Sequence, residues 1–419
     1  MQLMPDWEAL YASRMRNVAA SDIRERMKLL GAREIIHLGG GLPDPDIFPY
    51  QALADASARI WRDQAKARVA LQYAPSEGYG PLRDWIANDL TRNGARCGVD
   101  NVMIVNGSQQ GLDFVGKLLL SPGDRAMVEV PSFIGALRAF DAYQPTYVGL
   151  PEDPDRWDTS SLDGAKFCYV GPDFRNPTGT TLTLDERQKL LDLSDATGMP
   201  IVEDGCYERL RYDGEPIPSM FALGIARHGD VERSPVIQTG TFSKTIAPSL
   251  RVGWIAGPAN VIRKCVLIKQ ASDLATSALN QMLLLDVVET HLDIATRTAC
   301  DLYRARRDSM LSALGDAMPE GFTWTRPEGG LYVWMEMPEH LDGATFAQRA
   351  LVEHSVSVIS GAAFYPAGSD ISVKRNTVRL SFSMIAADRA REGIMRLGAL
   401  ARDMQDQAGT AALTAISTA

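Results

Sequence analysis

Residues 239–245 read Thr-Gly-Thr-Phe-Ser-Lys-Thr and follow a short apolar run, Val236–Gln238. A lysine that lies between hydroxyl side chains and follows a glycine turn can sit beside a phosphate and be partly desolvated. A partly desolvated amine is nucleophilic toward aldehydes, so Lys244 is a candidate for covalent chemistry. Arg251, seven residues later, offers a permanently charged bidentate donor for a phosphate. The alternative interpretation is an ordinary surface lysine after a strand.

Similar apolar runs lie on both sides of this segment and alternate with helical patterns, such as Ser108–Leu120. Turn residues follow nearly every run, and the intervals leave room for crossover helices. This alternation predicts an α/β fold with a mostly parallel sheet covered by helices on both faces. The other expected strands are Val102–Val105, Ala126–Val130, Phe167–Val170, Ile201–Glu203 and Val252–Ala256.

A second domain is expected after these strands, because 419 residues exceed what one compact core usually holds. A long helical stretch, Leu283–Leu314, leads into further short runs that predict a smaller α+β domain. Its expected strands are Phe322–Trp324, Leu331–Met337, Ser357–Ile359 and Thr377–Phe382. The predicted organisation is an N-terminal segment at 1–50 that crosses the active site and packs with the small domain, a large domain at 51–295, a small domain at 296–404 and a frayed tail at 405–419.

The composition argues against several classes of binding partner and indicates a cellular location. Lysine and arginine number 43 against 52 acidic residues, a net charge of −9, which argues against general binding to nucleic acid or acidic membranes. Five scattered cysteines without a C-x-x-C pair favour neither a disulfide framework nor a zinc site, and no metal is expected. The N-terminus lacks the apolar core of a signal peptide, and no run of 18 apolar residues exists. A cytoplasmic location is expected.

Several polar residues at strand ends fit the same phosphate and aldehyde chemistry. Asn106-Gly107-Ser108-Gln109 opens a helix, where free backbone N–H groups attract phosphate, although such turns are common. Asp204 ends a strand, where it could keep a pyridine nitrogen protonated or simply cap a loop. Asn176, in Asn-Pro-Thr-Gly, could contact a ring oxygen, although turn chemistry alone explains the motif.

Arg379 stands within the apolar run Val378-Arg379-Leu380-Ser381-Phe382. A charged side chain in such a position is costly unless it is paired, so a carboxylate partner is expected. That partner is either an aspartate or glutamate of the protein or a substrate.

The order of these motifs resembles that of class I/II aminotransferases, which have pyridoxal-phosphate (PLP) fold type I. This resemblance implies a seven-stranded type of sheet, mostly parallel and between helices, in the large domain. The similarity runs from about Ser21 to Leu400 and is closest to the subgroup that contains 2-aminoadipate and kynurenine aminotransferases. The motifs that carry it are Gly40-Gly41-Leu42-Pro43, Leu71-Gln72-Tyr73, Asn176-Pro177-Thr178-Gly179, Thr241-x-Ser243-Lys244 with Arg251, and Val378-Arg379-Leu380-Ser381-Phe382.

The resemblance implies a role for each matching residue. Lys244 would hold PLP as a Schiff base and move the proton during catalysis, and Asp204 would pair with the pyridine nitrogen. Asn176 and Tyr207 would contact the ring hydroxyl oxygen. Phe133 would stack on the ring, although it could also be a core aromatic. The phosphate would be bound by Ser108, Gln109, Thr241, Ser243 and Arg251.

The resemblance also implies where the substrates and a second subunit would lie. Arg379 would bind the α-carboxylate of the amino-acid or 2-oxo-acid substrate, and Gly40 and Gly41 would line the entrance. Tyr73 matches a phosphate ligand that these enzymes provide from the neighbouring subunit, which implies a homodimer with shared active sites. Arg24, in Ser21-x-Ile23-Arg24, is a candidate for binding a side-chain carboxylate, or else a solvated arginine.

Three functions remain open at this stage. The first is transamination between an L-α-amino acid and a 2-oxo acid by a ping-pong mechanism. The second keeps PLP and ends in β-elimination, cyclisation or oxidation, because one fold supports several outcomes. The third, a transcription regulator, is disfavoured because about twenty residues precede the matched region. Arg175, where the subgroup usually has glutamine, weakens any inference about the substrate.

Overall fold

The computed structural model describes residues 4–15, 34–159 and 164–417, with side chains described up to residue 408. Its largest sheet has seven strands in the order β2-β8-β7-β6-β5-β3-β4. Only β8 runs antiparallel to its neighbours β2 and β7 within this sheet; the other pairs are parallel. The strands are β2 (Val102–Val105), β3 (Arg125–Glu129), β4 (Thr146–Leu150), β5 (Ala165–Val170), β6 (Ile201–Asp204), β7 (Val236–Thr241) and β8 (Gly253–Ala256).

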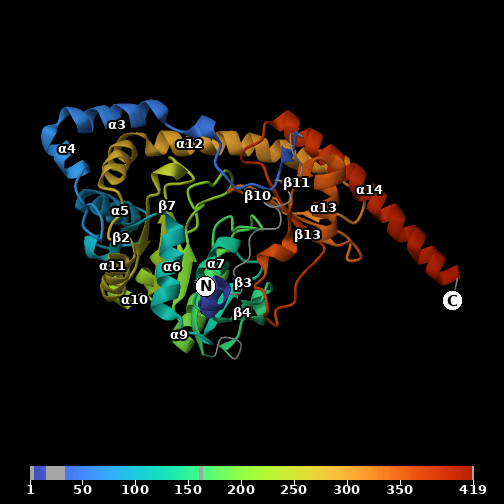
Figure 1. Cartoon of the computed structure of the whole chain (residues 1–419), viewed down its shortest axis with the longest axis horizontal. Helices are drawn as coiled ribbons and strands as arrows, with labels where there is room; N and C mark the ends of the chain where they lie inside the picture. Colours follow the sequence, from blue (N-terminus) through green and yellow to red (C-terminus); the bar gives the residue numbers. More distant parts are fainter. Residues whose placement is uncertain (1–3, 16–33, 160–163, 418–419) are drawn as a thin grey trace.

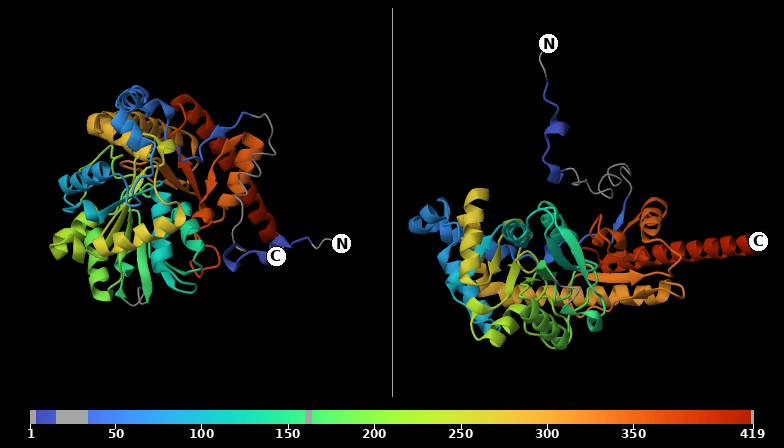
Figure 2. Two further views of the ribbon diagram at one scale, coloured as in Figure 1. Left: turned by 60° about the vertical axis from the view of Figure 1, so that its left-hand side comes forward. Right: turned by 90° about the horizontal axis from the view of Figure 1, so that it is seen from below.

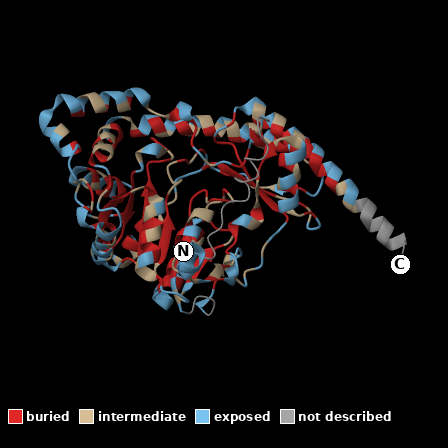
Figure 3. Ribbon diagram, viewed as in Figure 1, coloured by how far each residue is buried: buried red, intermediate tan, exposed pale blue. Residues whose placement is uncertain are grey.

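The sheet is buried on both faces, because alternate side chains of each strand enter two different hydrophobic clusters. Met103 packs with α6, α7 and α11 on one face, and Ile104 packs with α5, α9 and α10 on the other. The strands therefore form the buried centre of the large domain, with helices outside (Figure 3). These helices are α5 (Gly80–Arg92), α6 (Ser108–Leu119), α7 (Ile134–Asp141), α9 (Leu184–Thr197), α10 (Met220–His228) and α11 (Ala259–Ser272).

Helix α12 (Ala278–Ala317) joins the large domain to the small one and runs along one side of the molecule (Figure 1). Ala295 of this helix packs in the large-domain cluster, whereas Ala299 packs in the small-domain cluster. The hydrophobic cluster that the helix contacts thus changes between residues 295 and 299. Helices α3 (Tyr50–Arg62) and α4 (Gln64–Ala70) also pack against α12.

The small domain is built on an antiparallel sheet in the order β12-β13-β10-β9. Ile36 of the N-terminal segment and Val356 pair in a separate two-stranded parallel sheet, so this segment packs with the small domain. The elements are β1 (Ile36–His37), β9 (Thr323–Trp324), β10 (Tyr332–Glu336), α13 (Gly343–His354), β11 (Val356–Ser357), β12 (Ile359–Ser360), β13 (Thr377–Ser381) and α14 (Ala387–Ser417), with the short α1 (Trp7–Leu10) near the N-terminus.

The segment expected to be a frayed tail is helical in the structure as far as Ser417, because α14 continues through it. The end of α14 projects away from the body of the molecule (Figure 2). None of the helices in the described part of the chain combines the length and apolar character that crossing a bilayer requires.

Candidate active site

A cavity of about 750 Å³ lies where the two domains meet, at the carboxyl ends of the parallel strands. Ligands of open α/β sheets bind at this edge, because the loops that follow the strands converge there. The cavity brings together twelve of the residues predicted from the sequence: Gly41, Ser108, Gln109, Phe133, Asn176, Asp204, Tyr207, Thr241, Ser243, Lys244, Arg251 and Arg379.

Hydroxyl groups and an arginine gather at one end of this cavity. Ser108 begins α6, where backbone N–H groups are free, and its Oγ lies 3.1 Å from the Cys206 Sγ. Thr241 Oγ1 lies 2.9 Å from the Ser243 Oγ. Arg251 donates to the Asn106 carbonyl at 3.0 Å, which holds its guanidinium beside the α6 N-terminus. This donor set suits a phosphate dianion.

The close approach of Arg251 requires glycine at position 107. A Cβ built on Gly107 would lie 2.5 Å from the Arg251 Nη2, and the backbone there has φ +77°, a conformation that favours glycine. The Gly107 turn therefore places both the start of α6 and Arg251 around one point.

A buried carboxylate lines the cavity at the end of β6. Asp204 is 8% exposed and accepts a hydrogen bond from the Tyr169 hydroxyl at 2.8 Å. It also accepts one from the backbone N–H of Cys206 at 3.3 Å. These bonds fix the carboxylate in place, and an ionised carboxylate so placed attracts a protonated ring nitrogen.

Lys244 and two tyrosines meet in the middle of the cavity. The Lys244 Nζ lies 3.4 Å from the Gly41 carbonyl oxygen and 5.7 Å from the ring centre of Tyr207. The hydroxyls of Tyr207 and Tyr332 are 3.1 Å apart. Burial raises the pKa of Tyr207 well above its usual value, so its hydroxyl stays protonated and can donate a hydrogen bond.

Arg379 is buried at the small-domain side of the cavity, with 6% of its surface exposed. It donates to the Asn176 Oδ1 and to the Gly39 carbonyl, both at 2.6 Å. Its guanidinium carbon lies 4.2 Å from the ring centre of Tyr332 and 4.9 Å from that of Phe364. Desolvation lowers the pKa of Arg379, although an arginine remains charged in this setting.

The carboxylate partner expected for Arg379 does not come from the described residues. No aspartate or glutamate among residues 4–15, 34–159 and 164–408 forms an ion pair with it, and its Nε has no hydrogen-bond partner there. A buried cation that is held only by neutral groups and open to a cavity is a binding site for an anion.

The two glycines predicted at the entrance differ in their surroundings. A Cβ on Gly41 would lie 1.9 Å from the Tyr332 hydroxyl, whereas a Cβ on Gly40 would meet no atom within 4 Å. Gly40 is exposed and does not line the cavity. Close approach of the backbone therefore requires glycine at 41 and not at 40, and the carbonyl that contacts Arg379 belongs to Gly39.

Gly41→Ala is expected to lower kcat/KM about 100-fold, because the added methyl displaces the Tyr332 hydroxyl that lies between Asn176 and Tyr207. Steady-state kinetics with one amino acid and one 2-oxo acid measure the effect. Gly40→Ala is the matched control, and we expect it to change kcat/KM less than twofold. Equal losses in the two variants would contradict this interpretation.

Two lining residues form an ion pair that the strand pattern did not predict. Arg175 Nη1 lies 3.5 Å from the Glu129 Oε2, and the Arg175 Nε donates to the Thr180 hydroxyl at 2.8 Å. Burial raises the pKa of Glu129 to about 7. Glu129 is the last residue of β3. The only feature of the sequence that could have indicated a role for it is a charged residue within an apolar run, just before Pro131.

Tyr73 and Arg24 are the remaining predicted site residues. Tyr73 is 80% exposed and does not line the cavity of its own chain. Arg24 falls in residues 16–33, outside the described part of the chain.

The fold and the site together define a class. A large α/β domain and a smaller domain that enclose a lysine, a glycine turn at a helix N-terminus and a buried aspartate have the architecture of fold type I PLP enzymes. Free donors for a phosphate, a carboxylate for a ring nitrogen and an amine for an aldehyde all fit this cofactor.

The chain belongs to the family of class I and II aminotransferases, because the family model with that description matches residues 33–397. Enzymes of this family use PLP. Aromatic-amino-acid aminotransferase 1 of Thermococcus litoralis is 36% identical over 94% of this chain and 94% of its own length. The protein is therefore a PLP-dependent aminotransferase.

Solved structures agree with this assignment over nearly the full length. The kynurenine aminotransferase of Pyrococcus horikoshii, solved with PMP, is 36% identical, with a TM-score of 0.87 and coverage of 95% of this chain and 98% of its own. The alpha-aminoadipate aminotransferase LysN of Thermus thermophilus, complexed with N-(5'-phosphopyridoxyl)-L-leucine, is 34% identical, with a TM-score of 0.85 and coverage of 96% and 100%.

Proposed function

We propose that this cavity binds PLP and moves the amino group of an L-α-amino acid to a 2-oxo acid by a ping-pong mechanism. The observation that carries the proposal is Arg379, a buried guanidinium that faces the cavity without a carboxylate from the described residues. It would bind the α-carboxylate that amino acids and 2-oxo acids share. The same arginine thus serves both halves of the reaction.

Each of the other residues has a role that follows from its position. Ser108, Gln109, Thr241, Ser243 and Arg251 would hold the phosphate, and Phe133 would cover one face of the ring. Asp204 would keep the ring nitrogen protonated, and Asn176 and Tyr207 would donate to the ring oxygen. PLP, when bound, supplies the electron sink that accepts the electron pair released at the substrate α-carbon.

Lys244 is the group that would move the proton. Its amine lies beside the Gly41 carbonyl and the Tyr207 ring, and the Tyr207 hydroxyl is 3.1 Å from that of Tyr332, which the Arg379 guanidinium contacts. With the substrate carboxylate fixed by Arg379, the α-hydrogen would face this amine. The amine would take it as a general base and deliver it to the cofactor carbon C4′.

The substrate we propose is an L-α-amino acid of the 2-aminoadipate, glutamate, aromatic or branched-chain type. Support comes from relatives whose names specify aromatic amino acids, 2-aminoadipate and kynurenine. The family match favours transamination over β-elimination, cyclisation or oxidation on the same cofactor.

The deciding experiment is the visible absorption spectrum of the purified protein with PLP, before and after addition of L-glutamate. We expect the band of lysine-bound PLP to convert to that of the aminated cofactor and to return when a 2-oxo acid is added. Repeating the titration with L-2-aminoadipate, L-phenylalanine and L-leucine would rank the donors. Release of ammonia or pyruvate, without return of the first band, would contradict transamination.

We also propose that two chains form a homodimer in which each completes the active site of the other. Tyr73 and Leu71 are 80% and 75% exposed, and Leu42, which lines the cavity, is 60% exposed. Large apolar side chains in such positions are typical of surfaces that a partner covers. The Tyr73 hydroxyl would then reach the phosphate in the neighbouring subunit.

Tyr73→Phe is expected to raise the dissociation constant for PLP about 10- to 100-fold, because one hydrogen bond to a charged phosphate is lost. Fluorescence titration of the apoprotein with PLP measures this, and light scattering measures the mass. Tyr11→Phe, at another exposed tyrosine, is the matched control and should leave PLP affinity unchanged. A monomer that binds PLP as tightly as before would refute the shared site.

A further inference from the structure

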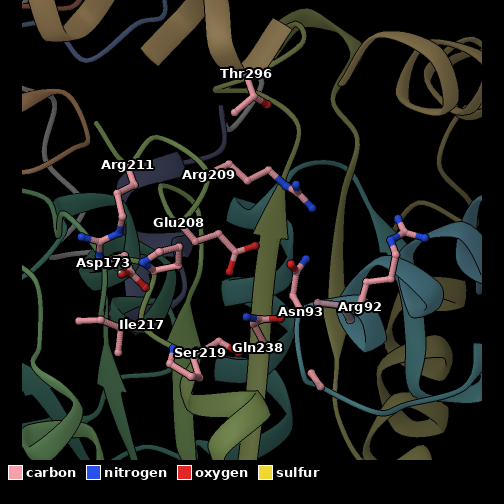
Figure 4. A pocket seen from close by; sticks show the side chains of 14 residues that line it. Arg92, Asn93, Asp173, Glu208, Arg209, Arg211, Ile217, Ser219, Gln238 and Thr296 are labelled. Carbon is pink, nitrogen blue, oxygen red and sulfur yellow. Dashed lines mark hydrogen bonds and ion pairs between the residues drawn. The ribbon is translucent and has the colours of Figure 1, made fainter. Parts of the chain in front are cut away.

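A second cavity, of about 560 Å³, lies on the other side of the loop that follows β6. Asp173 is the only described residue that lines both this cavity and the one that contains Lys244. The walls of the second cavity come from the 208–219 loop, from the end of α5, from Gln238 of β7 and from Thr296 of α12 (Figure 4). Leu90 and Ile217 give it apolar surface.

The arginines that line this second cavity are already paired with carboxylates. Arg209 and Arg92 both pair with Asp89, and the Arg92–Asp89 distance is 3.0 Å. Arg211 pairs with Asp173 at 3.2 Å and with Glu328 at 3.0 Å. An anion entering the cavity would therefore compete with existing ion pairs, so the cavity is poorly suited to anions.

Glu208 differs from these groups because its charge has no partner. No hydrogen bond or ion pair joins its carboxylate to another residue within the described ranges. Burial raises the pKa of Glu208 to about 7, with Asp173 and Asp89 adding to the effect and Arg209 and Arg187 opposing it. The negative charge of this carboxylate is thus incompletely compensated by the protein.

Gln238 faces the same space and is also without a partner. The residue is 1% exposed, yet neither its Nε2 nor its Oε1 makes a hydrogen bond to any described group. A Cβ built on Gly205 would lie 3.4 Å from the Gln238 Nε2 and 3.4 Å from the Glu208 Oε2, so the two side chains flank one point. Figure 4 shows both side chains extending between the loop and β7.

The buried Gln238 amide lacks partners, which is unfavourable, and the half-buried Glu208 carboxylate beside it has no counter-ion within hydrogen-bond distance. An ammonium group would supply a counter-charge to the Glu208 carboxylate and a donor for the Gln238 Oε1, and the Gln238 Nε2 lies on the Glu208 side of the same space. A short hydrocarbon chain would then lie against Leu90 and Ile217. We infer that this second cavity is a binding site for a small cationic amine, held by Glu208 and Gln238.

The test uses the holoenzyme after borohydride reduction, so that the cofactor aldehyde cannot react with the probe. The probe is n-butylamine, and isothermal titration calorimetry measures its dissociation constant. We expect saturable binding that weakens at least tenfold in Glu208→Gln, which keeps the shape and removes the charge. Glu215→Gln, an exposed glutamate of the same loop, is the matched control and should bind as the unaltered protein does.

A second variant decides the matter if Glu208→Gln does not fold. Ile217→Trp fills the cavity from its partly exposed wall and should also weaken binding at least tenfold. Absence of binding to the unaltered protein, or equal binding by all variants, would overturn the inference. Glu208 does not line the cavity that contains Lys244, so binding that survives Glu208→Gln would be assigned to that cavity and would likewise overturn it.

Discussion

Lys244→Ala is expected to abolish the visible band of lysine-bound PLP and to lower kcat by at least 10⁴-fold. The variant loses the only amine that lines the cavity in the described part of the chain. It therefore loses both the covalent attachment and the general base, and a positioned base alone contributes about 10²–10⁴-fold. Absorption spectroscopy and a coupled transaminase assay measure the two losses separately.

Lys264→Ala is the matched control, because this lysine is exposed on α11 and distant from the cavity lining. It should keep both the band and the activity. Adding a small amine such as methylamine to Lys244→Ala should restore part of the proton transfer, since the deleted group was an amine. Full activity in Lys244→Ala would refute the assignment of this residue.

Arg379→Gln is expected to lower kcat/KM for amino acids by roughly 30- to 4,000-fold. This range corresponds to a loss of about 2–5 kcal/mol, as expected when one partner of a buried charge pair is removed. The kcat/KM of Arg379→Lys should lie between those of the unaltered protein and Arg379→Gln, because lysine keeps the charge but loses the bidentate geometry. Steady-state kinetics with L-glutamate and with 2-oxoglutarate should show the loss in both directions.

A purely structural role for Arg379 would affect every substrate, so a substrate without a carboxylate tells the two roles apart. The rate of reaction of the bound cofactor with ethylamine should be unchanged in Arg379→Gln. The lysine-bound PLP band should also persist, because Arg379 contacts Asn176 and Gly39 and not the phosphate end. An equal loss with ethylamine would contradict carboxylate binding.

The sequence predicted the central strands well because their composition and their burial agree. Val102–Val105 is apolar throughout and is buried throughout as β2. Strand β4 (Thr146–Leu150) was not predicted, because it lies at the sheet edge and Gly149 interrupts its pattern. The predicted strand Ser357–Ile359 is divided in the structure between β11 and β12, which pair with different strands.

In the cavity, residues within motifs could be predicted, whereas their contacts could not. The pairing of Arg379 with the Gly39 carbonyl joins positions 340 residues apart, and no local pattern contains it. The same holds for the enclosure of its guanidinium by Tyr332 and Phe364. The choice between Gly40 and Gly41 likewise depended on the Tyr332 hydroxyl, whose place is set by the small-domain sheet.

The continuity of α12 limits how this protein can be divided or recombined. Its 40 residues extend for about 60 Å without interruption, and the hydrophobic cluster changes within the helix and not in a loop. A chimaera that exchanges the small domain with that of a relative would have to be joined inside a hydrogen-bonded helix, with the buried faces on both sides kept in phase. Insertion of one residue at the joint would rotate everything that follows by about 100° around the helix axis, and Arg379 would be carried away from Lys244.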